Sequence, residues 1–220
     1  MSKKYKLTDE TINLNGATLY RIEALKDFGE IKKGDKGGFI ESEDNLSHEG
    51  NAWVYDDACV YDNALVTDDA CVSDNARVYG NARLYDNTRV CGYAWVADNA
   101  RVYGDANVCD DSSVFGSACV YGNAHVYGDA LVRGYACVCG DAEISNKSDY
   151  IVFQNWWSSG RYFTWTRSNN MWSVGCFYGT GEELIKKAYK DSELSGREYE
   201  RVVRYVESIL AEENLSKGAN

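Results

Sequence analysis

The chain of 220 residues contains no proline and two histidines, His48 and His125. Because proline cannot donate a backbone hydrogen bond, its absence means that no sheet ladder loses a donor. Two histidines are too few for a zinc site built on three of them. His125 stands alone in the central region, without a polar cluster that would orient it as a general base. Composition therefore argues against metal-dependent or acid–base catalysis.

Long apolar runs are also missing. No segment is apolar enough to span a bilayer, and no secretory signal is recognisable, so we expect a soluble, cytoplasmic protein without a membrane partner. In that compartment the eight cysteines are expected to be free thiols. Cys91 and Cys109 stand eighteen residues apart, as do Cys119 and Cys137. No metal or cofactor is expected, because the short paired spacings typical of zinc ligands are missing.

The sequence has instead a six-residue repeat that runs without a break from Asn51 to Ile144. An aliphatic residue, nearly always valine, stands at every sixth position from Val54 onward, sixteen times in all. Alanine stands two residues before each, except at Thr88 and Ser112. Alternation along a short strand buries these two positions and displays the residue between them. The linking tripeptides are rich in Gly, Asn and Asp, which turn the chain at low steric cost.

This pattern resembles that of the hexapeptide-repeat family, whose chains form a left-handed parallel β-helix with three hexapeptides per coil. The resemblance implies a mainly β protein of about five coils, in which residues eighteen apart stack at about 4.8 Å. On that geometry Cys91 and Cys109, and Cys119 and Cys137, should be neighbours on adjacent coils. Because the residues before and after the repeat do not follow its pattern, we predict an N-terminal β cap (1–50), a hexapeptide-repeat β-helix (51–146) and a small C-terminal α+β module (147–220). The cap is needed because the end of a β-helix is an open hydrogen-bonding edge.

Stacking by eighteen sorts the displayed residues into three columns. They are Trp53, Cys71, Arg89, Asn107, His125 and Glu143; Cys59, Arg77, Trp95, Ser113 and Leu131; and Leu65, Arg83, Arg101, Cys119 and Cys137. Corner residues should stack as well, since like side chains stabilise strands that lie in register. The expected ladders are Tyr85, Tyr103 and Tyr121, and Asn63, Asn81 and Asn99.

The C-terminal segment has a different composition. Residues 150–178 are rich in aromatic side chains, and two turn signals, at 158–160 and 168–170, divide them into three strands. Two helices should follow, each opened by a capping box, Thr180 with Glu183 and Ser195 with Glu198. We therefore predict a βββαα module. Its aromatic rings are either its core or a surface that anchors a partner.

Charge is distributed unevenly. The net charge is −11, and residues 51–144 hold thirteen Asp and one Glu against five Arg and no Lys. This acidity argues against direct nucleic-acid binding and is compatible with competition for a nucleic-acid-binding protein. Arg77, Arg83 and Arg89 fall on successive repeats and should form a basic girdle around one coil, with Arg101 stacked over Arg83.

The two ends carry a narrower resemblance. Residues 19–29 and 37–47, and residues 156–165 and 175–184, are similar to the opening and closing segments of uncharacterised hexapeptide-repeat proteins from phages and prophages. The resemblance implies a phage or prophage protein that acts in the host cytoplasm, without assigning an activity. Small accessory phage proteins often bind a host enzyme.

Enzymes of the hexapeptide-repeat family are best known as acyltransferases, which place a histidine general base at a trimer interface beside an inserted loop. The repeat here has no insertion, so we expect no catalytic residue. We predict a non-catalytic protein that binds a host defence factor, such as a CRISPR effector or another nucleic-acid enzyme. We also expect the chain to form a homo-oligomer, a dimer or trimer. Three alternatives for the function remain: a self-associating scaffold, a sponge for a nucleotide signal, and an acyltransferase.

The candidate partner-binding residues are displayed arginines and aromatics, the types that dominate protein interfaces. In the repeat they are Arg77, Arg83, Arg89, Arg101, Trp53 and Trp95, and in the C-terminal module they are Trp156, Trp157, Arg161, Trp165 and Arg167.

Overall fold

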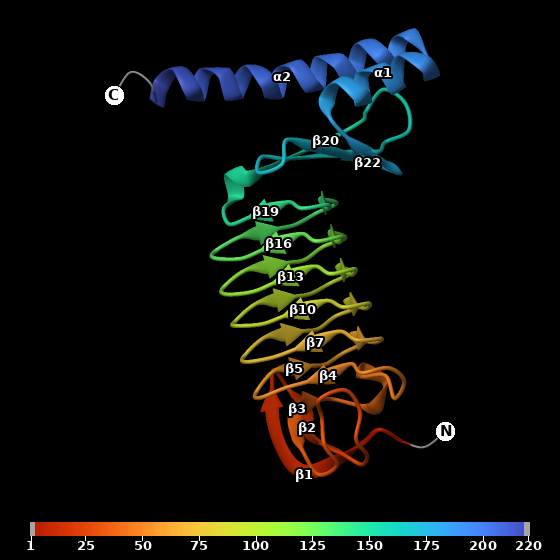
Figure 1. Ribbon diagram of the computed structural model, residues 1–220, viewed down its shortest axis with the longest axis vertical. Coiled ribbons are helices and arrows are strands. Elements are labelled where there is room, and N and C mark those ends of the chain that lie inside the picture. The colour runs from red at the N-terminus through yellow and green to blue at the C-terminus, as the bar shows by residue number, and fades with distance from the viewer. Residues whose placement is uncertain (1–2, 218–220) are drawn as a thin grey trace.

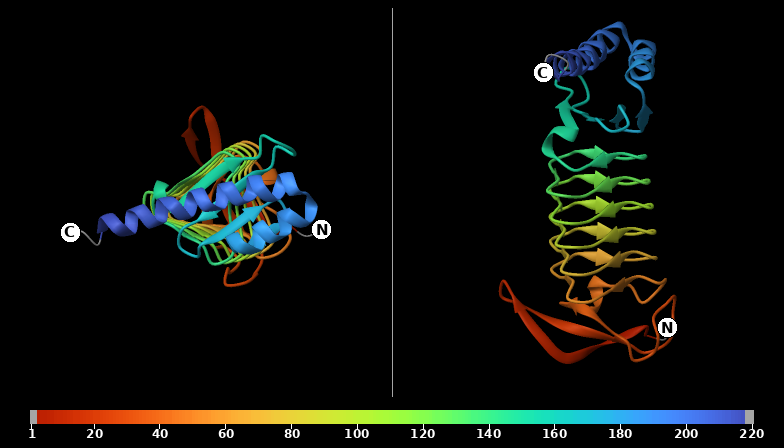
Figure 2. Two further views of the ribbon diagram at one scale, coloured as in Figure 1. Left: turned by 90° about the horizontal axis from the view of Figure 1, so that it is seen from above. Right: turned by 60° about the vertical axis from the view of Figure 1, so that its left-hand side comes forward.

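The computed structural model describes residues 3–217 and has the shape of a rod. A parallel β-solenoid forms the shaft, a β-hairpin cap lies at one end, and a sheet with two helices lies at the other (Figures 1 and 2). The model confirms the predicted mainly β fold with a parallel β-helix, an N-terminal cap and a small C-terminal α+β module.

Each repeat contributes a two-residue strand, and strands three repeats apart pair in parallel. The strands are β4 (Trp53–Val54), β5 (Cys59–Val60), β6 (Leu65–Val66), β7 (Cys71–Val72), β8 (Arg77–Val78), β9 (Arg83–Leu84), β10 (Arg89–Val90), β11 (Trp95–Val96), β12 (Arg101–Val102), β13 (Asn107–Val108), β14 (Ser113–Val114), β15 (Cys119–Val120), β16 (His125–Val126), β17 (Leu131–Val132), β18 (Cys137–Val138) and β19 (Glu143–Ile144).

The solenoid has three faces, which we name after a central displayed residue. The Trp95 face contains β5, β8, β11, β14 and β17, the Arg101 face contains β6, β9, β12, β15 and β18, and the His125 face contains β4, β7, β10, β13, β16 and β19. The registers place Trp95 between Arg77 and Ser113, and Arg101 between Arg83 and Cys119. The three predicted columns are therefore confirmed.

The predicted ladders are present at the corners. The rings of Tyr85 and Tyr103 stack with centroids 4.9 Å apart, and those of Tyr103 and Tyr121 at 4.7 Å. The Asn63 amide donates to the Asn81 Oδ1 at 3.2 Å, and the Asn81 amide repeats this contact one coil further on. Like side chains at the coil spacing thus bind one another along the rod.

A second ladder joins aspartates to glycines. Asp98 lies in the left-handed region at φ 59°, and its carboxylate accepts a hydrogen bond of 3.0 Å from the Gly116 N–H in the next coil. Asp62 does the same for Gly80 at 3.1 Å. A Cβ on Gly80 would lie 2.9 Å from the Asp98 nitrogen, so the stacked position must lack a side chain. The turn residues therefore satisfy backbone donors that the sheets leave unpaired.

The interior contains stacked Ala and Val side chains, and nearly all are completely buried. Thr88 and Ser112, which replace alanine, are buried too. Their hydroxyls donate to the carbonyls of Tyr85 at 2.9 Å and Val126 at 3.3 Å. These bonds offset the cost of placing two polar groups in an apolar column.

The N-terminal segment is more than a cap. Strands β1 (Tyr5–Leu14) and β2 (Ala17–Ala24) form a hairpin, and β3 (Lys36–Ile40) pairs antiparallel with β2 and parallel with β5. After a 3₁₀ turn at Glu43–Asn45, Leu46 forms a parallel bridge to Val66. Ile40 and Leu46 therefore begin a further coil before residue 51, giving about six coils rather than about five. The eight-residue step from Leu46 to Val54 breaks the period and hides this coil in the sequence.

Buried side chains fasten the cap to the solenoid. The Lys4 ammonium lies in the interior and donates to the Ala52 carbonyl at 2.8 Å. The Tyr5 hydroxyl donates to the Leu46 carbonyl at 2.7 Å, and the Phe28 ring packs edge-on against Trp53. The open carbonyls at this end of the rod are thus paired with donors of the cap.

The C-terminal module has four strands rather than the predicted three. They are β20 (Tyr150–Gln154), β21 (Tyr162–Thr166), β22 (Met171–Val174) and β23 (Phe177–Gly179), preceded by a 3₁₀ turn at Lys147–Asp149 and followed by α1 (Gly181–Asp191) and α2 (Glu193–Lys217). The sequence analysis missed β23 because it occupies three residues between a turn and a helix cap. α2 lies across the end of the rod (Figure 1).

The helix starts agree in part with the predicted capping boxes. Thr180 and Glu183 form the expected reciprocal box, with the Thr180 N–H donating to the Glu183 carboxylate at 2.9 Å. The prediction for Ser195 is wrong, since α2 begins at Glu193. The hydroxyl of Ser192 accepts from the Ser195 N–H at 3.1 Å and occupies the capping position instead.

The module closes the last coil through side chains. The backbone N–H of Cys137 donates to Thr164 Oγ1 at 2.8 Å, and that of Glu143 donates to Ser168 Oγ at 2.7 Å. Hydroxyl groups therefore take the place of the carbonyls that another coil would supply.

Cys91 and Cys109 form a disulfide between adjacent coils, with Cα atoms 4.6 Å apart. Their predicted proximity is confirmed, but the expectation that all cysteines are free is wrong for this pair, because the coil spacing falls within the range a disulfide can bridge. Cys119 and Cys137 are also in register and remain free.

Lys4 should make stability depend on pH. Burial lowers the pKa of Lys4 from 10.5 to about 8. Between these values the unfolded chain holds a proton that the folded chain releases, so rising pH favours folding. Relative to Lys4→Met, the wild type should gain roughly 2 kcal/mol of unfolding free energy between about pH 7.5 and about pH 9.5. Urea denaturation at each pH measures this, and a constant difference between the two proteins contradicts it.

The disulfide should stabilise the fold. Replacing both Cys91 and Cys109 by serine should lower the free energy of unfolding by about 1–3 kcal/mol, because the eighteen-residue loop gains freedom in the unfolded chain. Urea denaturation with and without dithiothreitol provides the check. The reductant should destabilise the wild type and leave the double variant unchanged; equal curves for both proteins in the absence of reductant would be the contrary result.

Candidate functional site

Exposed aromatic side chains of the solenoid gather along the Trp95 face. Trp95 is 46% exposed, and Tyr93, at the corner where β11 begins, is 62% exposed. The His125 face displays Arg89, Asn107 and His125 at the equivalent positions. Large exposed rings on a protein surface often mark an interaction site. The Trp95 face is therefore the first place to look for function.

Two hollows lie on either side of Trp95, and together we call them the Trp95 groove. One, of about 370 Å³, is lined by Asn75, Arg77, Tyr93, Trp95, Asp111 and Ser113. The other, of about 330 Å³, is lined by Tyr79, Trp95, Ala97, Asp98, Ser113 and Phe115. Trp95 is the ridge between them.

Small residues in otherwise bulky columns create the groove. Ser113 pairs in register with Trp95 and fills less space than the indole beside it. At the corner that follows, Ala97 lies one coil from Tyr79 and one coil from Phe115. A large ring next to a hydroxymethyl or methyl group leaves its flank uncovered, and this produces a hollow on each side of Trp95.

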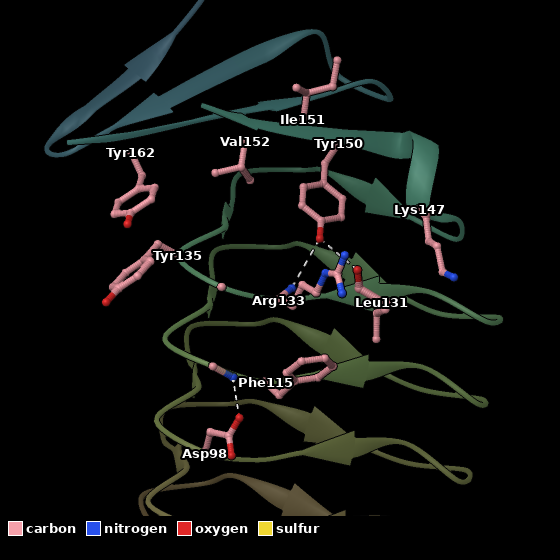
Figure 3. Close-up of a pocket in the computed structure, with 12 residues that line it drawn as sticks. Asp98, Phe115, Leu131, Arg133, Tyr135, Lys147, Tyr150, Ile151, Val152 and Tyr162 are labelled. Atoms are coloured by element: carbon pink, nitrogen blue, oxygen red, sulfur yellow. Dashed lines mark hydrogen bonds between the residues drawn. The ribbon is translucent and has the colours of Figure 1, made fainter. Parts of the chain in front are cut away.

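A larger hollow adjoins the groove where the solenoid meets the C-terminal module. This junction hollow, of about 750 Å³, shares Asp98 and Phe115 with the groove. It exists because the Trp95 face ends at β17, whereas the other two faces continue to β18 and β19, after which β20 crosses above (Figure 3). Its other main lining side chains are Leu131, Arg133, Tyr135, Lys147, Tyr150, Val152 and Tyr162.

Tyrosine side chains support the walls of the junction hollow. The Tyr150 hydroxyl donates to the Leu131 carbonyl at 3.0 Å and accepts from the Arg133 N–H at 3.3 Å, and burial raises the pKa of Tyr150. The rings of Tyr135 and Tyr162 stack with centroids 4.3 Å apart. Figure 3 shows this ring pair at the left of the hollow, Arg133 beneath Tyr150, and Lys147 at the far right.

The predicted girdle of Arg77, Arg83 and Arg89 is present, with one arginine on each face and Arg101 beside Arg83. Arg77 lies on the Trp95 face, with its guanidinium 5.8 Å from the Trp95 ring centroid. Arg83 and Arg101 pair on the Arg101 face, and Arg89 lies on the His125 face. Within residues 3–217 none of the four takes part in an ion pair. A single flat partner can therefore contact Arg77 with the groove, but not the whole girdle.

Three predicted binding residues have structural roles: two are buried and one forms an ion pair between a helix and the sheet. Trp53 and Trp165 are each 1% exposed, Trp53 because the N-terminal cap covers it. Trp165 donates its indole N–H to Asn170 at 2.9 Å. Arg167 holds the Glu213 carboxylate through two bonds of 2.7 and 3.2 Å, which raises the pKa of Arg167 and ties α2 to the sheet. Trp53, Trp165 and Arg167 are therefore no longer candidates for partner binding.

The remaining predicted residues of the module line neither the groove nor the junction hollow. Trp156 is 83% exposed, and its ring meets Trp157 edge-on. Trp157 is half-buried and packs against Phe163 of the module core. Arg161 is exposed. Trp156 is thus the one tryptophan of the described module that lies almost wholly in solvent.

The sequence analysis missed several lining residues. Tyr93 and Tyr135 occupy the repeat position at which Asn, Asp or Ser otherwise stands, so both were visible as exceptions to the pattern. Tyr162 and Lys147 could not be found in this way, because they reach the hollow from outside the repeat.

Three further features bear on function. Among the residues that the structure describes, no group of three His, Cys, Asp or Glu side chains is arranged to hold a metal ion. His125 Nε2 lies 3.5 Å from the Asn107 amide nitrogen. Within the same residues, none of the helices has the length and apolar character needed to cross a membrane.

Comparison with known proteins agrees with the geometry. Residues 70–85, which include β7, β8 and β9, match the family model described as YdcK Beta solenoid repeat. The fold that contains this match is a parallel β-solenoid. The match covers a short part of this β-solenoid repeat protein and includes Arg77 of the groove but not Trp95. No curated protein matches the chain.

Core and surface tryptophans should respond differently to truncation. Trp165→Ala should lower the free energy of unfolding by about 3–5 kcal/mol, because it empties a buried site. Trp95→Ala should change it by about 0.5 kcal/mol or less, since the indole lies on the surface. Chemical denaturation of both variants measures the contrast. Comparable losses would mean that Trp95 stabilises the fold rather than displaying a surface.

Proposed function

We propose that this β-solenoid repeat protein is a non-catalytic binding protein whose Trp95 groove takes up a protein partner. The observation that carries the proposal is the exposed pair Tyr93 and Trp95, with Arg77 against the indole, beside two hollows. Tyr, Trp and Arg are the residues most enriched at the energetic centres of protein interfaces. The hollows would receive partner side chains on both flanks of the indole.

The groove is also preorganised. The Trp95 N–H donates to the Ser112 carbonyl at 2.9 Å, and the Arg77 N–H donates to the Ala94 carbonyl at 2.9 Å. Both residues therefore lie on strands that are hydrogen-bonded to adjacent coils. A surface that is already ordered loses little conformational entropy when a partner binds.

The charge around the groove defines the partner's chemistry. Asp98 and Asp111 line the groove, and the repeat from 51 to 144 contains fourteen acidic residues against five arginines. The complementary partner surface is an apolar or aromatic protrusion surrounded by basic side chains. Enzymes that act on nucleic acids present such basic surfaces.

A narrower form of the proposal names the biological setting. The resemblance of both ends to phage and prophage proteins supports an anti-defence role, in which the chain inhibits a CRISPR effector or another nucleic-acid enzyme of the host by direct binding. The acidic surface supports this choice of partner, because it can occupy a site meant for nucleic acid.

Self-association is the main alternative. A two-fold dimer through the Trp95 face would bring the same acidic rim of both copies together, which is electrostatically unfavourable. End-to-end association is also disfavoured, because the cap and the module cover both ends of the solenoid. A protein of opposite charge fits the groove better than a second copy does.

The test compares matched tryptophan variants in a pull-down from bacterial lysate. Wild type and Trp156→Ala should retain one stoichiometric protein, and Tyr93→Ala with Trp95→Ala should lose it. The captured protein is then identified and purified, and titration calorimetry should show a loss of about thirtyfold or more in the groove variant.

Two results would count against the proposal. If Trp156→Ala loses the partner and the groove variant keeps it, the binding surface lies on the C-terminal module. If native mass spectrometry finds a defined homo-oligomer that carries no other protein, the scaffold alternative is favoured.

A further inference from the structure

We propose that the junction hollow binds a small planar aromatic anion of the size of a purine nucleoside monophosphate. The proposal goes beyond the protein-binding groove, because it assigns a small-molecule ligand to a different cavity with its own side chains. It rests on three features of that cavity: its volume, its aromatic surfaces and its two cations.

The volume suits a small ligand. About 750 Å³ is within the range of pockets that hold cofactors and drug-sized molecules, roughly 300–1,000 Å³. The cavity has apolar walls from two parts of the chain, with Phe115 and Leu131 from the solenoid and Val152 from β20. Figure 3 shows Val152 above and Phe115 below the space between Tyr162 and Tyr150.

Aromatic rings offer a surface on which a planar ligand can stack. Tyr135 and Tyr162 come from different parts of the fold and lie nearly parallel, at 13°. Tyr135 remains 54% exposed after this contact, so ring surface is still open to a ligand. Bases stack on such rings without requiring a particular sequence or substituent pattern, since every base has a π face.

The cations supply the site for an anionic group. Arg133 and Lys147 both line the hollow, and neither takes part in an ion pair within the described residues 3–217. The carboxylate of Asp98 also lines it, but one of its oxygens already accepts the Gly116 N–H at 3.0 Å. Guanidinium and ammonium groups are the side chains that bind phosphate. Two unpaired cations at one cavity of an acidic protein thus favour an anionic ligand.

The ring pair and the two cations occupy different parts of the hollow. In Figure 3, Tyr135 and Tyr162 lie to the left of Tyr150, Arg133 lies directly below Tyr150, and Lys147 lies farther to the right. The Tyr150 hydroxyl is already bonded to the Leu131 carbonyl and the Arg133 N–H, so these bonds hold the Tyr150 ring in place above Arg133. A ligand with a ring at one end and a phosphate at the other matches this division.

The experiment titrates the full chain with AMP and GMP by isothermal calorimetry. At least one nucleotide should bind saturably at one site per chain. Adenosine has the ring without the charge, and ribose 5-phosphate has the charge without the ring. The affinity of each should be lower than that of the nucleotide by a factor of about ten or more. Absence of saturable binding by both nucleotides would overturn the proposal.

Variants place the binding in the cavity. Arg133→Gln with Lys147→Gln should weaken nucleotide binding about tenfold or more, since both charges are removed while the backbone bond from Arg133 to Tyr150 is kept. Arg161→Gln, an exposed arginine outside the hollow, is the matched control and should bind like the wild type. Equal affinity in the double variant and the wild type would show that the nucleotide binds elsewhere.

The same titration separates this inference from the proposed function. Tyr93→Ala with Trp95→Ala removes the ridge of the Trp95 groove and should leave nucleotide affinity unchanged. Loss of nucleotide binding in that variant would contradict a separate site in the junction hollow. If the pull-down captures no partner protein, in contrast, that result contradicts only the proposed function of the Trp95 groove.

Discussion

The backbone hydrogen bonds between coils are the interaction on which the rest of the molecule depends. An N–H group such as that of Trp95 or Tyr79 reaches the carbonyl seventeen residues further along the chain, at 2.9 and 3.0 Å. The same offset recurs from coil to coil, so one register applies to the whole shaft. It places valine on valine inside, tyrosine on tyrosine at a corner, and a fixed column of displayed residues on each face. The shaft therefore behaves as a rigid support.

On such a support, a binding surface arises from departures from the repeat. Ser113 and Ala97 are small where their columns allow bulk, and Tyr93 and Tyr135 are large where the turn needs only Asn or Asp. None of these exchanges disturbs the interior, because all four positions are outside the buried Ala and Val columns. The repeat thus fixes the fold while its displayed and corner positions remain free to acquire chemistry.

The same separation explains what could be predicted from the sequence. The columns, the tyrosine and asparagine ladders and the closeness of Cys91 to Cys109 follow from the period of six together with the three hexapeptides per coil that the family resemblance implies. The burial of Trp53 does not, because Phe28 and Tyr5 of the cap cover a position that the repeat displays. The pairing of Arg167 with Glu213, the short strand β23 and the first coil behind an eight-residue step also depend on contacts between distant segments. The sequence predicted part of the groove, because Arg77 and Trp95 were among the candidate binding residues. It did not predict the junction hollow.

The point at which the shaft stops has a consequence of its own. Because strands pass from face to face in turn, the number of hexapeptides decides which face is left short when the chain exits into β20. A chain with one more repeat would end on the adjoining face, and its module would close over a different column. A chain with three more would end on the same face, farther along by about 4.8 Å. The number of repeats therefore determines which face of the solenoid the module covers. Adding repeats in multiples of three keeps that face and changes only the length of the solenoid.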